Sequence, residues 1–392
     1  MTRARLISFA AVLALCGGMA AADDIPVRII TFNTEEGIAD TAARREASGN
    51  QLTTLDFDGA GPNTALMPDI LCLQETRSDS QLLSFRDDYL PGYSVWRGNQ
   101  HDSGGNTQAV IFAPYLTLLQ ATEWNHGGPR WHHRMVFQVD GSDEILVVYN
   151  AHFKAFGDSG SVATRREEAN NLANRVALDW ANGVDITYDG VPDLPMNYYV
   201  VTGDLNQSDF SSDVIDSLII GGDNGLDTGL NDVRVESILG AQVGGAFIGG
   251  TQNTRFGLEN RLDYVLACDA IFEEFDTNQD GTWWQSELNN AGFVYFSGDD
   301  GGQRASGDTD ATSVASDHAP VVVNFTIPAS GGIPGDIDGD GDVDQADLGA
   351  LLSAYGSSDG DPNWNPDADL DGDGDVDQAD LGILLSNYGI GI

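Results

Sequence analysis

The run YYVVTGDLNQSD, residues 198–209, places an acid and an amide two positions apart directly after β-prone residues. Asp204 and Asn206 are residue types that turns also favour, so an ordinary turn is the alternative interpretation of this stretch taken alone. A carboxylate at the end of a buried strand is costly unless it is paired, hydrogen-bonded or bound to a metal ion. The rest of the chain has to decide between these interpretations.

Polar side chains of the same kinds accompany other β-prone runs, at one end of the run, next to it or inside it. They are Asn33, Glu75, His152, Asp263, Asp317 and His318. One such position indicates a turn, but a set this rich in Asn, Asp, Glu and His predicts a single convergent site. Attack on phosphorus needs a metal clamp, a base and donors for the charge that develops on the oxygens, and these residue types supply all three.

The elements that must position these residues are short strands. The β-prone runs are VRIITFN (27–33), DILCLQ (69–74), QAVIFA (108–113), EILVVYN (144–150), NYYVVTG (197–203), RLDYVLA (261–267) and APVVVNFTI (319–327). Many are apolar at successive positions, which predicts burial on both faces. A helical pattern covers 164–182 and begins with a capping box of Thr164 and Glu167. Strands and helices without strict alternation predict two sheets packed face to face with helices outside.

The ordered motifs TFN, LQE, NAHF, GDLN with RLDY, and SDH lie between about residues 25 and 327. Together they resemble the endonuclease/exonuclease/phosphatase superfamily, whose fold is the DNase I-like one. The resemblance implies the α+β class, with a four-layer sandwich of two packed β-sheets flanked by helices. It also implies a metal-dependent phosphoric ester hydrolase, here a phosphodiesterase.

The resemblance implies a metal site. Glu75, with Asn33 beside it, would hold Mg²⁺ or Mn²⁺, and Asp317 would complete or orient the ligand shell. Oxygen ligands suit a hard ion that keeps several of its waters.

The remaining roles are also implied by the resemblance. His318, steered by the carboxylate of Asp263, would act with Asp204 in activating water. His152 and Asn206 would bind the non-bridging phosphate oxygens and stabilise the charge on them.

Each residue also has a structural alternative. His152 or His318 taken singly is equally consistent with an ordinary hydrogen-bonding role, and Asp263 with an ion pair to Arg261. The chain departs from DNase-type members at Gln108, where a glutamate would orient the histidine equivalent to His152. A neutral amide stabilises an imidazolium less well than a carboxylate, so His152 is expected to be less basic than in those members.

The formal net charge of −43 argues against loose adhesion to nucleic acid. A nuclease would need divalent cations or a local basic strip, and HGGPRWHHR (126–134) offers one around Arg130 and Arg134. Ordinary surface arginines are the alternative. Further candidates for binding the substrate phosphate are Lys154, Arg165 and Arg166.

A phosphodiester substrate, with nucleic acid preferred, is therefore the leading interpretation. A phosphomonoesterase or a sphingomyelinase-like lipid phosphodiesterase on the same fold is the alternative. A non-catalytic binding protein is the second alternative, and it would require a broken site.

The tail repeats one motif with a period of 33, in GDIDGDGDVDQADLGALLSAYG (335–356) and ADLDGDGDVDQADLGILLSNYG (368–389). Each copy has acids at loop positions 1, 3, 5, 9 and 12 and Gly at 6, which is EF-hand-like spacing for Ca²⁺. The acids are Asp336, Asp338, Asp340, Asp342, Asp344, Asp347, Asp369, Asp371, Asp373, Asp375, Asp377 and Asp380. A plain acidic tail is the alternative.

The repeat pair resembles a type I dockerin. That resemblance implies a small all-α EF-hand-like module, Ca²⁺ binding and a cohesin-like or cell-surface partner. Gln345-Ala346 and Gln378-Ala379 stand where dockerins carry partner-reading residues.

A third EF-hand-like loop, DTNQDGTWWQSE, occupies 276–287. Its candidate Ca²⁺ ligands are Asp276, Asn278, Asp280, Thr282 and Glu287.

Residues 1–22 have the pattern of a secretory signal peptide, with Arg3 and Arg5 before an apolar run and an A-x-A-like cleavage site after it. No other stretch is long and apolar enough to cross a bilayer, so a secreted protein, extracellular or periplasmic, is expected. The expected organisation is a catalytic domain at 23–328, a linker at 329–334 and the repeats at 335–392.

After cleavage two cysteines remain, Cys72 and Cys268. They are expected to be either buried thiols or one bridge.

Overall fold

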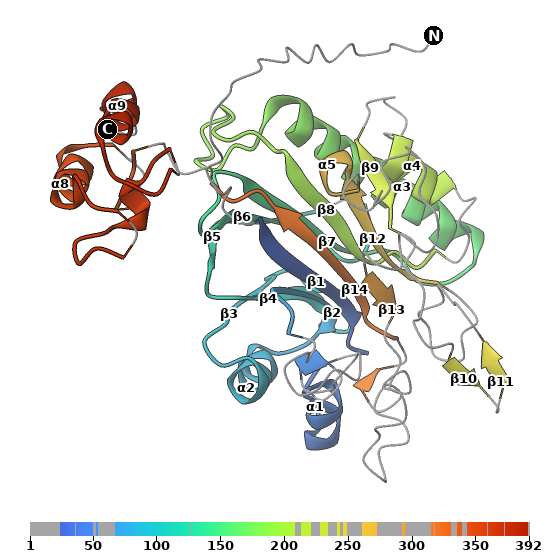
Figure 1. Cartoon of the computed structure of the whole chain (residues 1–392). Helices are drawn as coiled ribbons and strands as arrows, with labels where there is room; N and C mark the ends of the chain where they lie inside the picture. The colour runs from blue at the N-terminus through green and yellow to red at the C-terminus, as the bar shows by residue number, and fades with distance from the viewer. Residues whose placement is uncertain are drawn as a thin grey trace. The chain divides into compact units, whose positions relative to one another are not determined.

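The structure is a computed structural model, and the chain divides into two units, Ile25–Ile327 and one that includes Pro328–Ile392 (Figure 1). The residues that it describes are 24–35, 37–49, 52–53, 67–125, 127–207, 213–220, 228–233, 241–243, 246–248, 261–272, 292–294, 315–316, 318–330, 335–338, 343–358, 360–371 and 373–390. The expected signal peptide and the loop 276–287 lie outside these residues.

Two mixed sheets of six strands form the centre of the Ile25–Ile327 unit. The first has the order β13 (Gly292–Val294), β14 (Val321–Ile327), β1 (Ile25–Asn33), β2 (Ile70–Thr76), β4 (Thr107–Phe112) and β3 (Ser94–Arg97). The second has the order β5 (Leu116–Trp124), β6 (His132–Val139), β7 (Ile145–His152), β8 (Tyr198–Asp204), β12 (Asp263–Cys268) and β9 (Leu230–Asp232). A separate hairpin joins β10 (Ala241–Val243) and β11 (Ala246–Ile248). The pairs β1–β2 and β7–β8 are parallel.

The two sheets pack face to face through fully buried apolar side chains. Phe112 of β4 and Phe137 of β6 meet across the interface with ring centroids 5.1 Å apart. Cys72 and Cys268 belong to the same core. Both are free, buried thiols, which confirms the first of the two expectations. Burying each large apolar side chain contributes about 1.5–3 kcal/mol, so this interface supplies much of the folding free energy.

Helices cover the outer faces of both sheets (Figure 1). On the first sheet, Leu82 and Phe85 of α2 (Asp79–Tyr89) join a cluster with Leu71 and Leu73 of β2. The neighbouring helix is α1 (Ala42–Gly49). The second sheet is covered by α3 (Ser159–Asn182) and α4 (Asp213–Ile220), and the short α5 (Asp269–Phe272) follows β12. Two packed sheets flanked by helices confirm the expected sandwich.

The seven expected strands are all present, and the predicted burial on both faces is confirmed for β7, whose eight residues are all buried. The predicted start of the long helix is wrong. It begins at Ser159 rather than at Thr164, because the Asp158 carboxylate accepts the backbone N–H groups of Gly160 and Ser161. No helix in the described part of the chain combines the length and apolar character that crossing a membrane requires.

The Pro328–Ile392 unit has a small core of its own. It contains α8 (Gln345–Ala354), the 3₁₀ turn η4 (Pro366–Ala368) and α9 (Gln378–Asn387). Leu351 of α8 and Leu384 of α9 are fully buried in one cluster with Val343 and Val376. The two loop–helix repeats therefore pack against each other through equivalent side chains.

Candidate active site

The carboxyl ends of the two parallel strand pairs carry the predicted residues. Asn33 and Glu75 lie at the ends of β1 and β2, and His152 and Asp204 end β7 and β8 in direct register. Asp263 opens β12 opposite Asp204. Since parallel neighbours end at the same edge of a sheet, residues far apart in sequence meet there.

Asp204 and Asn206 are placed by an unusual piece of backbone. Gly203 has φ of +137°, and a Cβ at this position would lie 1.9 Å from the carbonyl oxygen of Ala151 on β7. Only glycine lets the two strands approach this closely. Asn206 adopts φ of +50°, its backbone N–H donates to Asp204 Oδ1 at 2.8 Å, and its side-chain amide donates to the carbonyl of Phe153 at 3.2 Å. The turn that follows β8 is therefore itself part of the candidate site.

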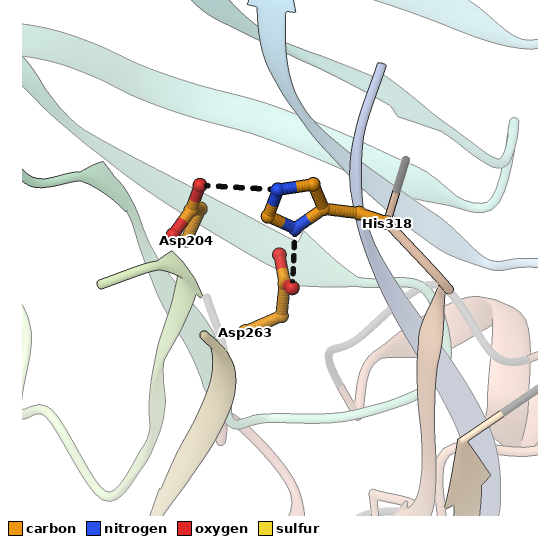
Figure 2. Close-up of side chains that lie close together, drawn as sticks. All are labelled: Asp204, Asp263 and His318. Atoms are coloured by element: carbon orange, nitrogen blue, oxygen red, sulfur yellow. Dashed lines mark hydrogen bonds and ion pairs between the residues drawn. The ribbon is translucent and has the colours of Figure 1, made fainter. Parts of the chain in front are cut away.

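Three side chains form a row at the centre of the site (Figure 2). His318 Nδ1 lies 2.7 Å from Asp263 Oδ2, and its Nε2 lies 3.8 Å from Asp204 Oδ2. Because the carboxylate of Asp263 only accepts, His318 Nδ1 donates in this contact, and Nε2 faces Asp204. Burial raises the pKa of the Asp204 carboxyl, an effect that the nearby His318 opposes.

The hydrogen-bond partners of Arg261 and Asp263 favour the catalytic interpretation of Asp263. Arg261 makes a bidentate ion pair with Asp232, at 2.7 and 2.9 Å. Asp263 is fully buried against His318.

His152 faces the same centre from the other side. Its Nε2 lies 3.5 Å from Asp204 Oδ2 and 3.7 Å from Glu75 Oε1. Burial, followed by the charge of Arg130, holds its pKa well below the usual range of histidine. Among the described residues, neither His152 Nδ1 nor the amide of the fully buried Gln108 has a hydrogen-bond partner. Burial therefore favours the neutral form of His152.

Asn33 and Glu75 close the site. Asn33 donates from Nδ2 to Asp204 Oδ2 at 2.9 Å and to Glu75 Oε1 at 3.2 Å. Glu75 adopts φ of +57° within a register shift of the β2–β4 ladder. A non-glycine residue in this region is strained, and such strain is concentrated at functional sites.

The Endonuclease/Exonuclease/phosphatase family matches over residues 30–318. The chain belongs to this family. Members of the Endonuclease/Exonuclease/phosphatase family hydrolyse phosphoric esters with the help of divalent metal ions.

Solved structures align with about three quarters of the chain. One from Bacteroides vulgatus is 14% identical and covers 77% of this chain and 99% of its own, with a TM-score of 0.47. One from Bacteroides thetaiotaomicron is 14% identical, with 78% and 99% covered and a TM-score of 0.47. The human Nocturnin catalytic domain with bound sulfate anion is 17% identical, with 77% and 96% covered and a TM-score of 0.46. The curated proteins contain no match to the chain.

The residues fit the divalent ion that the family uses. Three carboxylates, Glu75, Asp204 and Asp263, gather at the site, and two histidines accompany them. Asp204, Asp263 and His318 each offer one ligand atom within 4.8 Å of the others. Such a concentration of buried negative charge suits a hard cation. Asn33 turns its amide nitrogen to Glu75 and Asp204, so its oxygen would ligate only after rotation of the amide. Asp317 lies outside the described residues.

The three candidate phosphate-binding residues have different surroundings. Lys154 follows the site on the segment after β7, with its Nζ 4.7 Å from the centre of the Phe156 ring. Arg165 is only 4% exposed and donates to the carbonyls of Lys154 and Phe156. We therefore assign Arg165 to holding this segment rather than to contacting phosphate. Arg166 lies exposed on α3.

The prediction that residues 126–134 form an exposed basic strip is wrong. Its last three residues begin β6, where His132, His133 and Arg134 are all buried, and Arg134 pairs with Asp179 at 2.7 Å. Arg130 contacts the segment that follows His152. It donates to the carbonyl of Phe153 at 3.0 Å and pairs with Asp102 at 3.2 Å.

Sequence reasoning missed Glu168, a fully buried acid of α3. Its Oε2 accepts the backbone N–H of Lys154 at 2.8 Å, so it fixes the chain two residues after His152. Burial raises its pKa to about 7. The sequence signal that could have identified Glu168 is its place, as an acid, on the apolar face of the helical pattern at 164–182.

The acidic repeats of the tail form one cluster of acids each. One contains Asp336, Asp338 and Asp347, and the other Asp369, Asp371 and Asp373, each with ligand atoms within 4.8 Å of one another. Asp347 also accepts the backbone N–H groups of Ile337 and Asp344. Asp380 accepts the equivalent groups 33 residues later. Asp340 and Asp342 lie outside the described residues, and Asp344 and Asp377 cap α8 and α9.

Proposed function

We propose that this chain is an exported, divalent-metal-dependent phosphodiesterase that cleaves nucleic acid. The observation that carries the proposal is the row Asp263–His318–Asp204, which faces His152, Asn33 and Glu75 across one buried centre. An ordered base, a hydrogen-bond donor and a carboxylate site for a cation are what hydrolysis of a phosphodiester requires. All of these residues retain chemically competent side chains, which argues against a merely binding protein.

The side chains have distinct roles in the proposed reaction. Asp263 holds the proton of His318 on Nδ1, so Nε2 is available to take a proton from the attacking water. Asp204, whose Oδ2 lies 3.8 Å from His318 Nε2, would orient that water. Glu75, with Asn33 and Asp317, would hold the divalent ion, which would supply positive charge to the phosphoryl oxygens.

The opposite wall stabilises the charge that develops on the phosphate. Burial favours the neutral form of His152, which keeps one N–H that would donate to a phosphate oxygen. Asn206 is held by Asp204 and by the Phe153 carbonyl, and this hydrogen bonding fixes its amide before the substrate arrives. Donors fixed in advance cost little reorganisation during the reaction.

Nucleic acid is preferred as substrate because cationic side chains lie beside the site in an otherwise acidic chain. Lys154 belongs to the segment that follows His152, and Arg130 contacts that segment through the Phe153 carbonyl. In a molecule of charge −43, they are the local cations that would hold a polyanion in place.

The termini complete the proposal. Residues 1–22 would direct export and be removed, and the repeats would bind Ca²⁺ and anchor the enzyme through a cohesin-like or cell-surface partner. The acidic clusters of the two repeats support Ca²⁺ binding.

The test is hydrolysis by purified protein lacking residues 1–22. Single-stranded DNA, RNA, bis-p-nitrophenyl phosphate, the monoester p-nitrophenyl phosphate and sphingomyelin are each supplied with Mg²⁺, Mn²⁺ or Ca²⁺, with EDTA as the metal-free control. Cleavage of DNA or RNA that EDTA abolishes is expected. Hydrolysis of sphingomyelin alone, or of a phosphomonoester alone, would replace the proposed substrate by the corresponding alternative.

A further inference from the structure

The segment Phe153–Phe156 follows the catalytic histidine and is held by four polar side chains. The Phe153 carbonyl accepts from Arg130 and Asn206, at 3.0 and 3.2 Å. Glu168 accepts the Lys154 N–H at 2.8 Å. Arg165 donates to the carbonyls of Lys154 and Phe156 at 2.8 and 2.6 Å. The backbone of this short segment is therefore fixed rigidly relative to Asp204 and Asn206.

The fixed segment presents an aromatic ring to solvent. Phe156 is 73% exposed, and its backbone has φ of +79°, a conformation that disfavours large L-residues. Neither burial nor backbone preference explains a phenylalanine here. Strained backbone conformations that surrounding hydrogen bonds maintain are concentrated at functional sites.

The same segment carries the only lysine of the chain. Lys154 Nζ lies 4.7 Å from the centre of the Phe156 ring, within the range of a cation–π contact. Three residues separate Phe156 from His152, so their Cα atoms are at most about 14 Å apart. The ring and the ammonium group therefore belong to the segment that directly follows the proposed phosphate site.

We propose that Lys154 and Phe156 form a nucleobase platform, on which the base next to the cleaved phosphate stacks while the ammonium group pairs with a neighbouring phosphate. This inference rests on the proposed nuclease function and specifies how the substrate is held. Stacking on aromatic side chains beside a cation is the general way in which single-stranded nucleic acid is bound.

The position of Lys154 distinguishes this occupant from a choline headgroup. A quaternary ammonium also binds over aromatic rings. At this ring, however, the ammonium of Lys154 already occupies a contact with the π system, and it would repel a second cation. An aromatic base with an adjacent phosphate is attracted by both groups.

Binding is measured in a His318→Ala background, which separates it from cleavage. A fluorescein-labelled single-stranded oligonucleotide is titrated with the full protein in Mg²⁺, and anisotropy gives Kd. Phe156→Gly should raise Kd about tenfold, since stacking of one base contributes on this order. Phe156→Trp should keep the affinity, and an abasic oligonucleotide of the same length should bind equally weakly to the parent and to Phe156→Gly.

Tyr188 provides a matched control. It is 67% exposed, has φ of +62°, and follows the far end of α3, whose 24 residues span about 36 Å. Tyr188→Gly should leave oligonucleotide affinity unchanged. Phe156→Gly should also keep its melting temperature, because glycine accepts the positive φ, and this separates lost binding from lost folding.

Two results would overturn the platform. One is an unchanged Kd for Phe156→Gly, and the other is an equal loss for normal and abasic oligonucleotides. If sphingomyelin vesicles, and not the oligonucleotide, require Phe156, the occupant is a lipid and the proposal is wrong. A wild-type protein that binds the oligonucleotide through Phe156 but cleaves no nucleic acid would contradict the proposed function alone.

Discussion

At the scale of single residues, the roles of His318 and Glu75 can be tested by removing one group at a time. His318→Ala removes the proposed base, and Glu75→Gln removes a charged oxygen from the cation site. Each should lower phosphodiester hydrolysis by about 10²–10⁴-fold, the usual contribution of acid–base groups. Both proteins should keep the circular dichroism of the parent. Full activity in a folded His318→Ala protein would contradict the assigned mechanism.

Gln108 offers a gain-of-function test. Its buried amide and His152 Nδ1 both lack partners within the described part of the chain. Gln108→Glu would place a carboxylate where it can pair with His152, so activity should be retained or raised. The control is Gln74→Glu, which should lower the melting temperature more, because Gln74 Nε2 donates to Thr31 and Asn150. A folded but inactive Gln108→Glu protein would show that Gln108 does not face His152.

The sequence predicted residue types better than it predicted pairings. Asn33, Glu75, His152, Asp204 and Asp263 converge because each lies at a strand end, which is a local property. Partners chosen by tertiary structure could not be predicted. The partner of Arg261 is Asp232, 29 residues away, and Arg134 is buried against Asp179 of α3.

At the scale of elements, α3 links the site to pH through Glu168. Burial raises the folded-state pKa of this acid to about 7, although the Lys154 N–H and the charges of Arg130, Arg165 and Lys154 oppose the rise. The folded state therefore binds more protons than the unfolded state between about pH 4.5 and 7. The stability contributed by protonated Glu168 is present below this window and is lost as pH rises through it.

Glu168→Gln should remove that dependence, since its amide oxygen can still accept the Lys154 N–H. Between pH 5 and pH 7.5, its melting temperature should fall less than that of the parent, by on the order of 5 °C. Glu167→Gln, at the exposed neighbouring position, is the matched control and should behave like the parent. Identical slopes for Glu168→Gln and the parent would show that Glu168 does not titrate in this range.

Element boundaries show where sequence patterns stop being informative. Strands with apolar residues at successive positions were predictable, because burial on both faces leaves that signature. The strands β5 and β6 were missed, since β5 is half exposed and β6 contains two histidines and an arginine. Their place in the sheet is set by the pairing of β6 with β7 and of β5 with β6, and not by their own composition.

At the scale of the whole molecule, the repeats should depend on Ca²⁺ whereas the catalytic unit should not depend on the repeats. Each loop gathers six acids, in 336–347 and in 369–380, without a basic residue. The charge of Asp373 raises the pKa of Asp375, which is a sign of this crowding. The helices α8 and α9 have ten residues each and are too short to be stable alone. Ca²⁺ binding would therefore supply the folding free energy of the repeats.

Residues 335–392 expressed alone should be disordered by circular dichroism in EGTA and should gain helix when Ca²⁺ is added. Asp347→Ala and Asp380→Ala should weaken this response, because each buried carboxylate joins its loop to its helix. Leu352→Ala, at an exposed position of α8, is the control and should respond like the parent. A helical signal that persists in EGTA would show that the apolar cluster alone folds the repeats.

The complementary experiment ends the chain after Ile327, where the catalytic unit ends. Every residue of the proposed site lies at or before His318, and the last strand, β14, pairs with β1 inside the unit. The shortened protein should therefore keep both its melting transition and its rate of phosphodiester hydrolysis, while losing any Ca²⁺-dependent attachment to a partner. A shortened protein that is folded but inactive would place part of the active site in the repeats and would contradict their assignment to anchoring.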